Sequence, residues 1–305
     1  MTTPGRLSHG FTPLRYPGGK AKLSSFVKRI LRDNGLSDGH YVEPYAGGAG
    51  LALELLLHEY VEHVYLNDIS RPIWAFWHSV LHDTESLLRM IRNTRVTINE
   101  WDKQKRRLDN PLQTDNLKLG FATFFLNRTN RSGILNGGMI GGRSQAGEWK
   151  IDARYNPAEL ATRIEAIGNV ADRISLSRQD ALLFLQRGKA RWPAKTLIYL
   201  DPPYFEKGRC LYLDSYCASD HADIASLMQN TAWKQKWIVS YDDVPEINSL
   251  YAKSKKISYA LSYSAREVRK GREVMFFSRG LVPPPIPDTI QKANPPAREA
   301  SAQCA

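Results

Sequence analysis

Residues 41–68 read YVEPYAGGAGLALELLLHEYVEHVYLND, and this stretch decides the fold. Residues 41–44 predict a short strand that runs into a glycine-rich turn at 47–50. A leucine-rich helix is expected over residues 51–60, followed by a second strand at 64–66. Strand, glycine turn, helix and strand form a βαβ unit, which indicates a parallel sheet covered by helices.

The alternation of strands and helices resumes after residue 156. Further strands are expected at 174–176, 196–200, 237–241, 256–261 and 273–278. Together with the first two they predict an α/β protein with a Rossmann-like fold and a mostly parallel, seven-stranded sheet.

The sequence predicts that the chain is divided into four segments. Residues 1–70 and 156–280 would form two parts of one core domain. Between them, residues 71–155 carry helical patterns, a basic run and a loop rich in Gly, Asn and Arg, which predicts an inserted, mainly helical subdomain. The tail, 281–305, is proline-containing and then polar, so we expect it to be disordered.

The overall charge favours a polyanionic partner. Lys and Arg number 42 against 31 Asp and Glu, a formal charge of +11. Such an excess raises the local concentration of nucleic acid, although a high net charge also serves solubility alone. Charge therefore suggests a partner without deciding it.

The cysteines and the hydropathy of the chain indicate where in the cell the protein is expected. Cys210, Cys217 and Cys304 show neither paired disulfide spacing nor a CxxC pattern, so we expect no metal site and a reducing environment. The N-terminus has no apolar signal core, and no apolar stretch is long enough to cross a bilayer. These features predict a cytoplasmic protein without a membrane partner.

The strongest chemical signal is Asp201-Pro202-Pro203-Tyr204, directly after the apolar strand at 196–200. Ligands of open α/β sheets bind beyond the carboxyl ends of the strands. The prolines stiffen the turn and have no N–H, so the turn offers acceptors. The Asp201 carboxylate and the Pro202 carbonyl can accept both hydrogens of an exocyclic amine while the Tyr204 ring stacks on the base. The alternative is a turn that merely ends a strand.

This acceptor pair matches what an aromatic amine needs. The lone pair of adenine N6 is delocalised into the ring and attacks a methyl sulfonium poorly. Two acceptors on its N–H bonds favour a pyramidal nitrogen and free the lone pair. The predicted reaction is direct transfer, with catalysis by positioning and electrostatics and no covalent enzyme intermediate.

The second signal is Glu43-Pro44-Tyr45-Ala46-Gly47-Gly48-Ala49-Gly50, with Asp68 at the end of the following strand. Glycines let a backbone approach a nucleotide-like ligand, and an acidic residue at Asp68 suits ribose hydroxyls. By itself the turn could hold a dinucleotide or be an ordinary strand-to-helix turn. The dinucleotide motif GxGxxG fails, however, because Leu53 stands at its third glycine.

With the segment Leu14-Arg15-Tyr16-Pro17-Gly18-Gly19-Lys20, these motifs stand in the order of a known family. The sequence closely resembles the Dam-like, or D12-class, adenine-N6 DNA methyltransferases from about residue 11 to 278. The resemblance implies an enzyme that methylates adenine N6 in DNA from S-adenosylmethionine, with Asp201, Pro202 and Tyr204 as catalytic residues. The cofactor-binding residues that it implies are Tyr16, Lys20, Glu43, Pro44, Gly47, Gly48, Asp68 and Asp180. Residues 1–70 would then be the cofactor-binding part of the catalytic domain.

Two of these assignments have ordinary alternatives. Lys20 would lie near the cofactor or the target base, but a lysine on a loop is often simply solvated. Asp180 would hold the cofactor's adenine, but it also stands where a cap of the helix beginning at 181 is expected.

The resemblance places DNA recognition in the insertion, 71–155. Arg128 and Arg131, in Asn127-Arg128-Thr129-Asn130-Arg131, suit phosphate or guanine contacts, and Arg143 lies in the glycine-rich loop that follows. Double-stranded DNA is the implied partner, and the target adenine would have to rotate out of the duplex. A cognate restriction endonuclease is a candidate partner, in a bacterial cell or a phage-infected bacterium.

Three alternatives stay open at this point. The acceptor pair would serve cytosine N4, or an adenine in RNA, as well as an adenine in DNA. A catalytically silent DNA-binding protein could also keep the fold.

Overall fold

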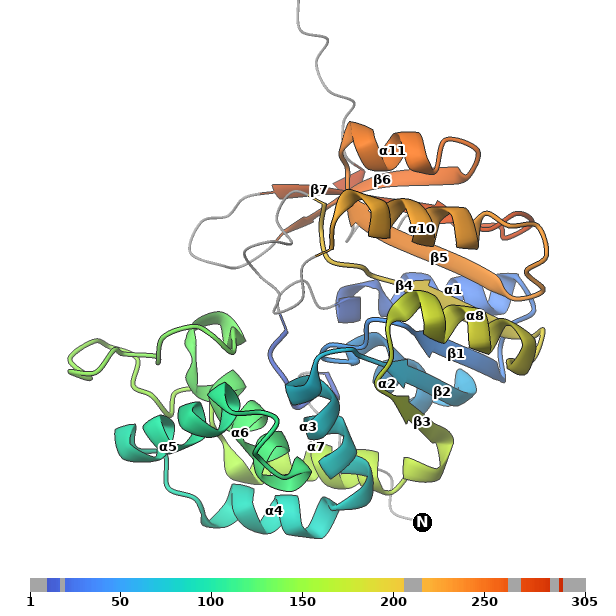
Figure 1. Cartoon of the computed structure of the whole chain (residues 1–305). Coiled ribbons are helices and arrows are strands. Elements are labelled where there is room, and N and C mark those ends of the chain that lie inside the picture. Colours follow the sequence, from blue (N-terminus) through green and yellow to red (C-terminus); the bar gives the residue numbers. More distant parts are fainter. Residues whose placement is uncertain (1–9, 17–19, 206–215, 263–269, 286–290, 293–305) are drawn as a thin grey trace, which may run out of the picture.

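The computed structural model describes residues 10–16, 20–205, 216–262, 270–285 and 291–292 (Figure 1). Its centre is an eight-stranded sheet in the order β3-β2-β1-β4-β5-β7-β6-β8. The strands are β1 (Gly39–Glu43), β2 (Val61–Asn67), β3 (Ile174–Ser177), β4 (Thr196–Leu200), β5 (Lys236–Asp242), β6 (Lys255–Ser262), β7 (Lys270–Phe277) and β8 (Gln291–Lys292). All seven predicted strands are present, and β8 is an addition of two residues.

The first five strands of the order are parallel, whereas β7 runs antiparallel to β5 and β6. All five residues of β4 are buried, because helices cover both faces of the sheet. This explains why the strand reads as a continuous apolar run. The arrangement confirms the predicted Rossmann-like, mostly parallel α/β fold.

Two hydrophobic clusters lie on the two faces of the sheet. Helices α1 (Ser24–Asp33) and α2 (Gly50–Leu57) cover one face. Helices α8 (Ala181–Arg191), α10 (Ala218–Met228) and α11 (Pro245–Leu250) cover the other (Figure 1). On α1 the buried side chains are Phe26, Val27, Ile30 and Leu31, the apolar face that the sequence pattern predicts.

Between β2 and β3 the chain forms a group of helices beside the sheet (Figure 1). These are α3 (Arg71–His82), α4 (Thr84–Asn93), α5 (Ile98–Asp109), α6 (Asn116–Thr129) and α7 (Pro157–Gly168). The side chains of Thr97 and Asp115 accept hydrogen bonds at the N-termini of α5 and α6, which fixes where these helices begin. This region is therefore mainly helical.

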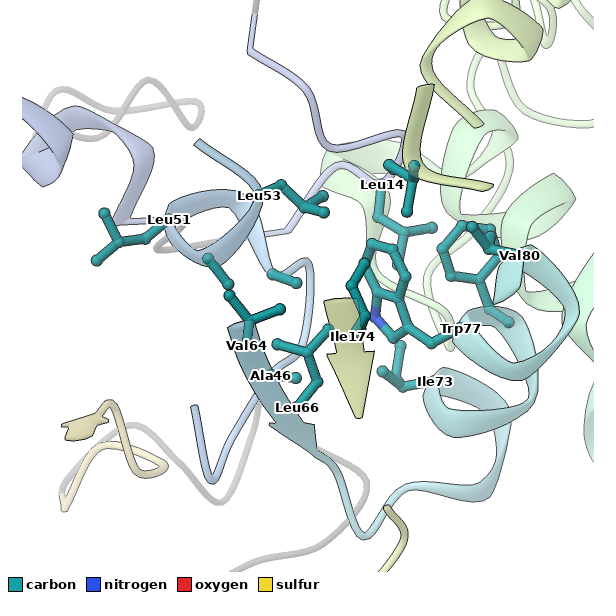
Figure 2. Close-up of a cluster of buried hydrophobic side chains, with 14 of the residues drawn as sticks. Leu14, Ala46, Leu51, Leu53, Val64, Leu66, Ile73, Trp77, Val80 and Ile174 are labelled. Atoms are coloured by element: carbon teal, nitrogen blue, oxygen red, sulfur yellow. The ribbon is translucent and has the colours of Figure 1, made fainter. Parts of the chain in front are cut away.

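Helix α3 packs against the sheet as well as against the other helices. Figure 2 shows Ile73 and Trp77 of α3 pointing toward the strands that carry Leu66 and Ile174. All four side chains are buried. The helical region is thus anchored to the sheet through its first helix.

The reversal of strand order lies between β1 and β4, which are neighbours in the sheet. The chain continues from β1 to one side of the sheet and from β4 to the other, so the carboxyl ends of these two strands form the topological switch point of the sheet. Ligands of open α/β sheets bind at this position. The glycine turn follows β1 and Asp201 follows β4, so the fold brings the two strongest sequence motifs to one place.

The predicted disorder of the tail is wrong for residues 281–285 and 291–292. Leu281 is buried in the core, and the Val282 amide donates to Asn34 Oδ1 at 2.8 Å. Gln291 and Lys292 pair with β6 as β8. Packing of one apolar side chain thus extends order past the last long strand, and the rest of the tail lies outside the described residues.

No helix in the described part of the chain is both long enough and apolar enough to span a bilayer.

Candidate active site

Asp201 lies at the carboxyl end of β4, where the sequence predicts it. Its Oδ1 accepts a hydrogen bond from Ser240 Oγ on β5 at 2.7 Å and lies 3.2 Å from Lys20 Nζ. The side chain of Asp201 is 28% exposed, whereas that of Lys20 is only 5% exposed. The carboxylate is therefore held from one side and open on the other, as an acceptor for an incoming group must be.

Lys20 is a buried residue of the site and is not a solvated lysine on a loop. It begins the short 3-10 helix Lys20–Leu23. Its Nζ lies 3.0 Å from Glu273 Oε2 on β7 and 3.4 Å from Tyr204 Oη, in addition to its contact with Asp201. Pro17–Gly19 of the same motif lie outside the described residues.

Glu273 joins the groups around Asp201 into one network. Its carboxylate accepts from Tyr204 Oη and from Tyr259 Oη, each at 2.6 Å, and from Lys20. Glu273 and Tyr259 are 2% and 1% exposed. Neither residue was singled out from the sequence, since they lie on strands β7 and β6, about 55 to 70 residues beyond Tyr204.

The two carboxylates of this network stabilise the Lys20 ammonium ion but repel each other. Burial alone would lower the pKa of Lys20, but Asp201, Tyr259 and Glu273 raise it well above the usual value, so Lys20 remains an ammonium ion. Burial raises the pKa of Asp201, the charge of Glu273 adds to the rise, and Lys20 opposes it. One cation thus sits between two carboxylates.

The glycine turn after β1 is fixed by side chains from three other segments. Asp68 Oδ2 accepts from the Gly47 amide at 2.8 Å, and Asp68 Oδ1 accepts from the Ser70 amide at 3.0 Å. Trp77 Nε1 donates to the Gly47 carbonyl at 2.8 Å, and Thr12 Oγ1 donates to the Gly48 carbonyl at 2.5 Å. The turn is preformed.

Both glycines are required by the close approach of the Tyr16 side chain. Gly47 adopts φ +46°, and a Cβ there would lie 2.7 Å from Tyr16 Cε1. A Cβ at Gly48 would lie 2.9 Å from Tyr16 Cβ. The segment that leads to Lys20 therefore rests directly on the turn after β1, which brings three predicted site residues together.

Glu43, the last residue of β1, is 7% exposed and lies behind the turn. Its Oε1 accepts from Tyr41 Oη and from the Ala52 amide, each at 3.1 Å. Burial raises its pKa to about 8, Asp201 adds to the rise, and the two hydrogen bonds oppose it. The shift favours the protonated, uncharged form of this side chain in the folded protein.

Glu43 should make the protein less stable as the pH rises. In an unfolded chain its proton leaves near pH 4.5, but in the folded protein it leaves near pH 8, so between these values the folded state holds the extra proton. A shift of that size corresponds to at most about 5 kcal/mol of unfolding free energy lost over this window. Urea unfolding from pH 5 to 9 should show a shallower pH dependence for Glu43→Gln than for the natural protein. The exposed Glu62→Gln is the matched control, and parallel curves for all three proteins would contradict the prediction.

Asp180 lies beyond the end of β3 and caps helix α8. Its Oδ1 accepts from the Leu183 amide at 3.1 Å, the alternative that the sequence left open. Its predecessor Gln179 is tied to Asn67, which accepts from the Gln179 amide and donates to the carbonyls of Gln179 and Pro44 at 3.0 Å each. Asn67, missed in the sequence, therefore links the carboxyl ends of β1, β2 and β3.

The three arginines predicted to bind DNA differ in their surroundings. Arg128 is half-buried, and its Nε donates to the Arg154 carbonyl at 2.9 Å. Burial, followed by the charge of Arg15, lowers its pKa to about 10. Arg131 is exposed. Arg143 is also exposed, and its guanidinium pairs with both carboxylate oxygens of Asp102 at 2.5 and 3.2 Å.

The asparagine before Arg128 holds the N-terminal segment in place. The Asn127 side chain accepts from the Arg15 amide at 2.7 Å and donates to the Arg15 carbonyl at 2.8 Å and the Gly133 carbonyl at 2.9 Å. Gly133, at φ +76°, could carry no side chain, because a Cβ would lie 2.3 Å from the Arg15 carbonyl oxygen. The segment that the sequence assigns to DNA contact thus also supports the approach to Lys20.

The model of the D12 class N6 adenine-specific DNA methyltransferase family matches residues 16–265. The chain belongs to this family. The match includes the glycine turn, Asp68, the helical region and Asp201, and it ends before Glu273.

Individual relatives are distant. The chain is 21% identical over 226 residues to the Type II methyltransferase M.MjaIII of Methanocaldococcus jannaschii, which covers 69% of this chain and 74% of the relative. Among solved structures, a Pyrococcus horikoshii protein provisionally described as an RNA methyltransferase has 9% identity and a TM-score of 0.42, with 88% and 91% of the two chains covered. The rRNA methyltransferase aviRa of Streptomyces viridochromogenes has 14% identity and a TM-score of 0.38, with 91% and 88% covered.

Membership of the family identifies the protein as an enzyme, an adenine-specific DNA methyltransferase. The predicted fold class and family are confirmed. In this D12-class methyltransferase the Asp201 turn and the glycine turn lie at the carboxyl ends of the adjacent strands β4 and β1.

Proposed function

We propose that this methyltransferase moves a methyl group from S-adenosylmethionine to N6 of an adenine rotated out of double-stranded DNA. The observation that carries the proposal is the position of the two turns at the carboxyl ends of the neighbouring strands β1 and β4. A nucleoside-like cofactor on the first turn and an amine on the second would meet in one crevice, so that a methyl group can pass directly between them.

The residues of the first turn fit the cofactor. Asp68 accepts hydrogen bonds from the Gly47 and Ser70 amides, and a carboxylate at the end of this strand suits ribose hydroxyls. Gly47 and Gly48 would line the methionine part, with Tyr16, Glu43 and Pro44 supporting the turn. Asp180 would lie at the adenine of the cofactor, and Lys20 would lie where the cofactor meets the target base. The bound cofactor supplies the methyl group on a positively charged sulfur.

Asp68→Ala should mainly weaken cofactor binding. The substitution removes the ribose acceptor and also frees the Gly47 and Ser70 amides, so we expect the Kd for S-adenosylmethionine to rise by about tenfold or more. Isothermal titration calorimetry measures the change. The exposed Asp223→Ala on α10 is the control, and an unchanged Kd for Asp68→Ala would contradict the role.

The second turn would activate the amine. Asp201 Oδ1 is already engaged by Ser240 and Lys20, so the more open part of the carboxylate and the Pro202 carbonyl would accept the two N6 hydrogens. As the N–CH₃ bond forms and the S–CH₃ bond breaks, positive charge moves to N6, and the proton that N6 then loses passes to Asp201. No covalent bond between enzyme and substrate is needed.

The DNA must deliver the adenine unpaired. Rotating a base out of a duplex costs a few kcal/mol, and the Tyr204 ring would offset part of that cost by stacking. In the helical region between β2 and β3, the exposed Arg131 and Arg143 suit phosphate contacts. Arg128, half-buried against Arg154, would instead shape the segment that carries them.

One experiment tests the proposal against its alternatives. The protein is incubated with methyl-labelled S-adenosylmethionine and unmethylated double-stranded DNA, and the products are digested to nucleosides and identified. We expect the label in N6-methyl-2′-deoxyadenosine. Label in N4-methylcytosine, or transfer only to RNA in a parallel reaction, would contradict the assignment.

A restriction endonuclease that reads the same sequence is the proposed biological partner. The support is the distant relative M.MjaIII, whose name identifies it as a Type II methyltransferase. Methylated DNA from the same reaction, challenged with a panel of endonucleases, should become resistant to those that recognise the methylated sequence.

A further inference from the structure

Glu273 lies at the centre of the active-site network but beyond residue 265, where the family match ends. The side chain is 2% exposed and receives three hydrogen bonds, from Lys20, Tyr204 and Tyr259. A buried second carboxylate is costly when one cation has to serve two anions. A charge that is kept buried at this energetic cost, beside the proposed catalytic residues, indicates a function.

The geometry shows what that charge does to Lys20. The ammonium is closer to Glu273 Oε2, at 3.0 Å, than to Asp201 Oδ1, at 3.2 Å. If Glu273 were uncharged, Lys20 would be paired with Asp201 alone, and Asp201 would become a weaker acceptor. With Glu273 charged, the three groups together carry one net negative charge, and Asp201, whose side chain is 28% exposed, is the carboxylate that an incoming amine can reach.

The same carboxylate fixes the turn that follows Asp201. Tyr204 Oη donates to Glu273 Oε1 at 2.6 Å, while Tyr259 Oη and Lys20 share Oε2. The hydroxyl end of the Tyr204 ring is thereby tied to β7. The ring orientation is set before any base enters.

We propose that Glu273 is a positioning residue for methyl transfer, which balances the charge of Lys20 so that Asp201 meets the amine as an unneutralised carboxylate. The negative charge favours the transition state in particular, because positive charge moves from the cofactor sulfur to N6 as the methyl group passes. The inference rests on the proposed function.

The test compares Glu273→Gln with the double variant Glu273→Gln/Lys20→Met. Glu273→Gln keeps the shape of the side chain and removes its charge, so kcat should fall by about tenfold or more, with the KM values for DNA and cofactor within about threefold of the natural enzyme. In the double variant the charge of Asp201 is again unopposed. Its kcat should therefore exceed that of Glu273→Gln by about threefold or more, which a merely structural role does not produce.

Two further variants separate charge from packing. Tyr259→Phe removes a hydrogen bond to Glu273 but no charge, so its kcat should fall less than that of Glu273→Gln. The exposed Glu246→Gln on α11 controls for loss of any carboxylate. If Glu273→Gln does not fold, as judged by its melting temperature, Glu273→Asp keeps the charge and should retain more activity than Glu273→Ala.

The outcomes are distinguishable from failure of the proposed function. If the natural protein transfers no label to adenine, the proposed function fails. If it is active but Glu273→Gln has a normal kcat, or loses activity mainly through KM, the inference is overturned. A double variant no faster than Glu273→Gln would also overturn it.

Discussion

Asp201→Ala should abolish methyl transfer while the protein still binds S-adenosylmethionine. The substitution removes the carboxylate that accepts from the amine, and it leaves the cofactor turn, which is held by Asp68, Trp77 and Thr12, untouched. Loss of a preorganised electrostatic group at a reacting centre lowers kcat by about a thousandfold. Single-turnover transfer of labelled methyl to a duplex measures the loss, and calorimetry with the cofactor should show a Kd changed by less than about threefold.

Asp201→Asn is the sharper companion to that variant. The amide has nearly the same size but carries no charge, so transfer should be almost as slow as in Asp201→Ala. Asp223→Asn, on the exposed side of α10, is the matched control and should behave as the natural enzyme. Near-normal turnover of Asp201→Asn would show that the carboxylate is not the acceptor.

Tyr204→Ala should have the second-largest effect, through loss of the ring that holds the rotated base. Base–aromatic stacking contributes about 1–3 kcal/mol, so kcat/KM for duplex DNA should fall by up to about a hundredfold. A fluorescent adenine analogue at the target position should then show less of the unstacked state when the enzyme binds. The cofactor Kd should not change.

Tyr204→Phe divides the ring from its hydroxyl. This variant keeps the stacking surface but loses the hydrogen bond to Glu273, so its kcat/KM should lie between those of the natural enzyme and Tyr204→Ala. A substrate in which the target adenine faces a mismatch is easier to rotate out and should restore part of the activity of Tyr204→Ala. Equal defects on paired and mismatched targets would contradict a role in holding the base.

The fold could be predicted because its signals are local. An apolar run at 196–200, a glycine turn after 41–44 and a leucine-rich helix each identify one element. The rule that ligands lie beyond the carboxyl ends of parallel strands then joins Asp201 to Gly47 without any knowledge of their distance. The structure adds that β1 and β4 are hydrogen-bonded neighbours, which makes that rule applicable here.

The residues that escaped prediction act through contacts between distant segments. Glu273 reaches Lys20 across 253 positions of the sequence, and Asn67 reaches Gln179 across 112. Neither lies in a recognisable motif, since one is a glutamate in a strand and the other an asparagine at a strand end. The only available signal was a polar residue in a stretch that otherwise reads as buried strand, which marks a side chain needing a partner.

Arg128 is a residue that the sequence predicts to contact DNA but that the structure shows to be half-buried. Its neighbours Asn127 and Arg131 suggested a run of DNA contacts, but the run lies on α6 and the turn after it, where successive side chains point in different directions. Arg128 therefore faces Arg154, while Arg131 is exposed. Composition can suggest a binding segment, but the helix geometry decides which members of it are accessible.

The hydrogen bonds of Asn127 to Arg15 have a consequence for engineering new specificities. They join the helical region to the N-terminal arm across 112 positions, and Gly133 admits that arm only because it has no side chain. A chimera that receives residues 71–155 from another member of the family would therefore lose these matched contacts, because its own residues 10–16 would pack against side chains from the donor. Transplants that carry residues 10–16 from the same donor should assemble a working enzyme more often than those that exchange the helices alone.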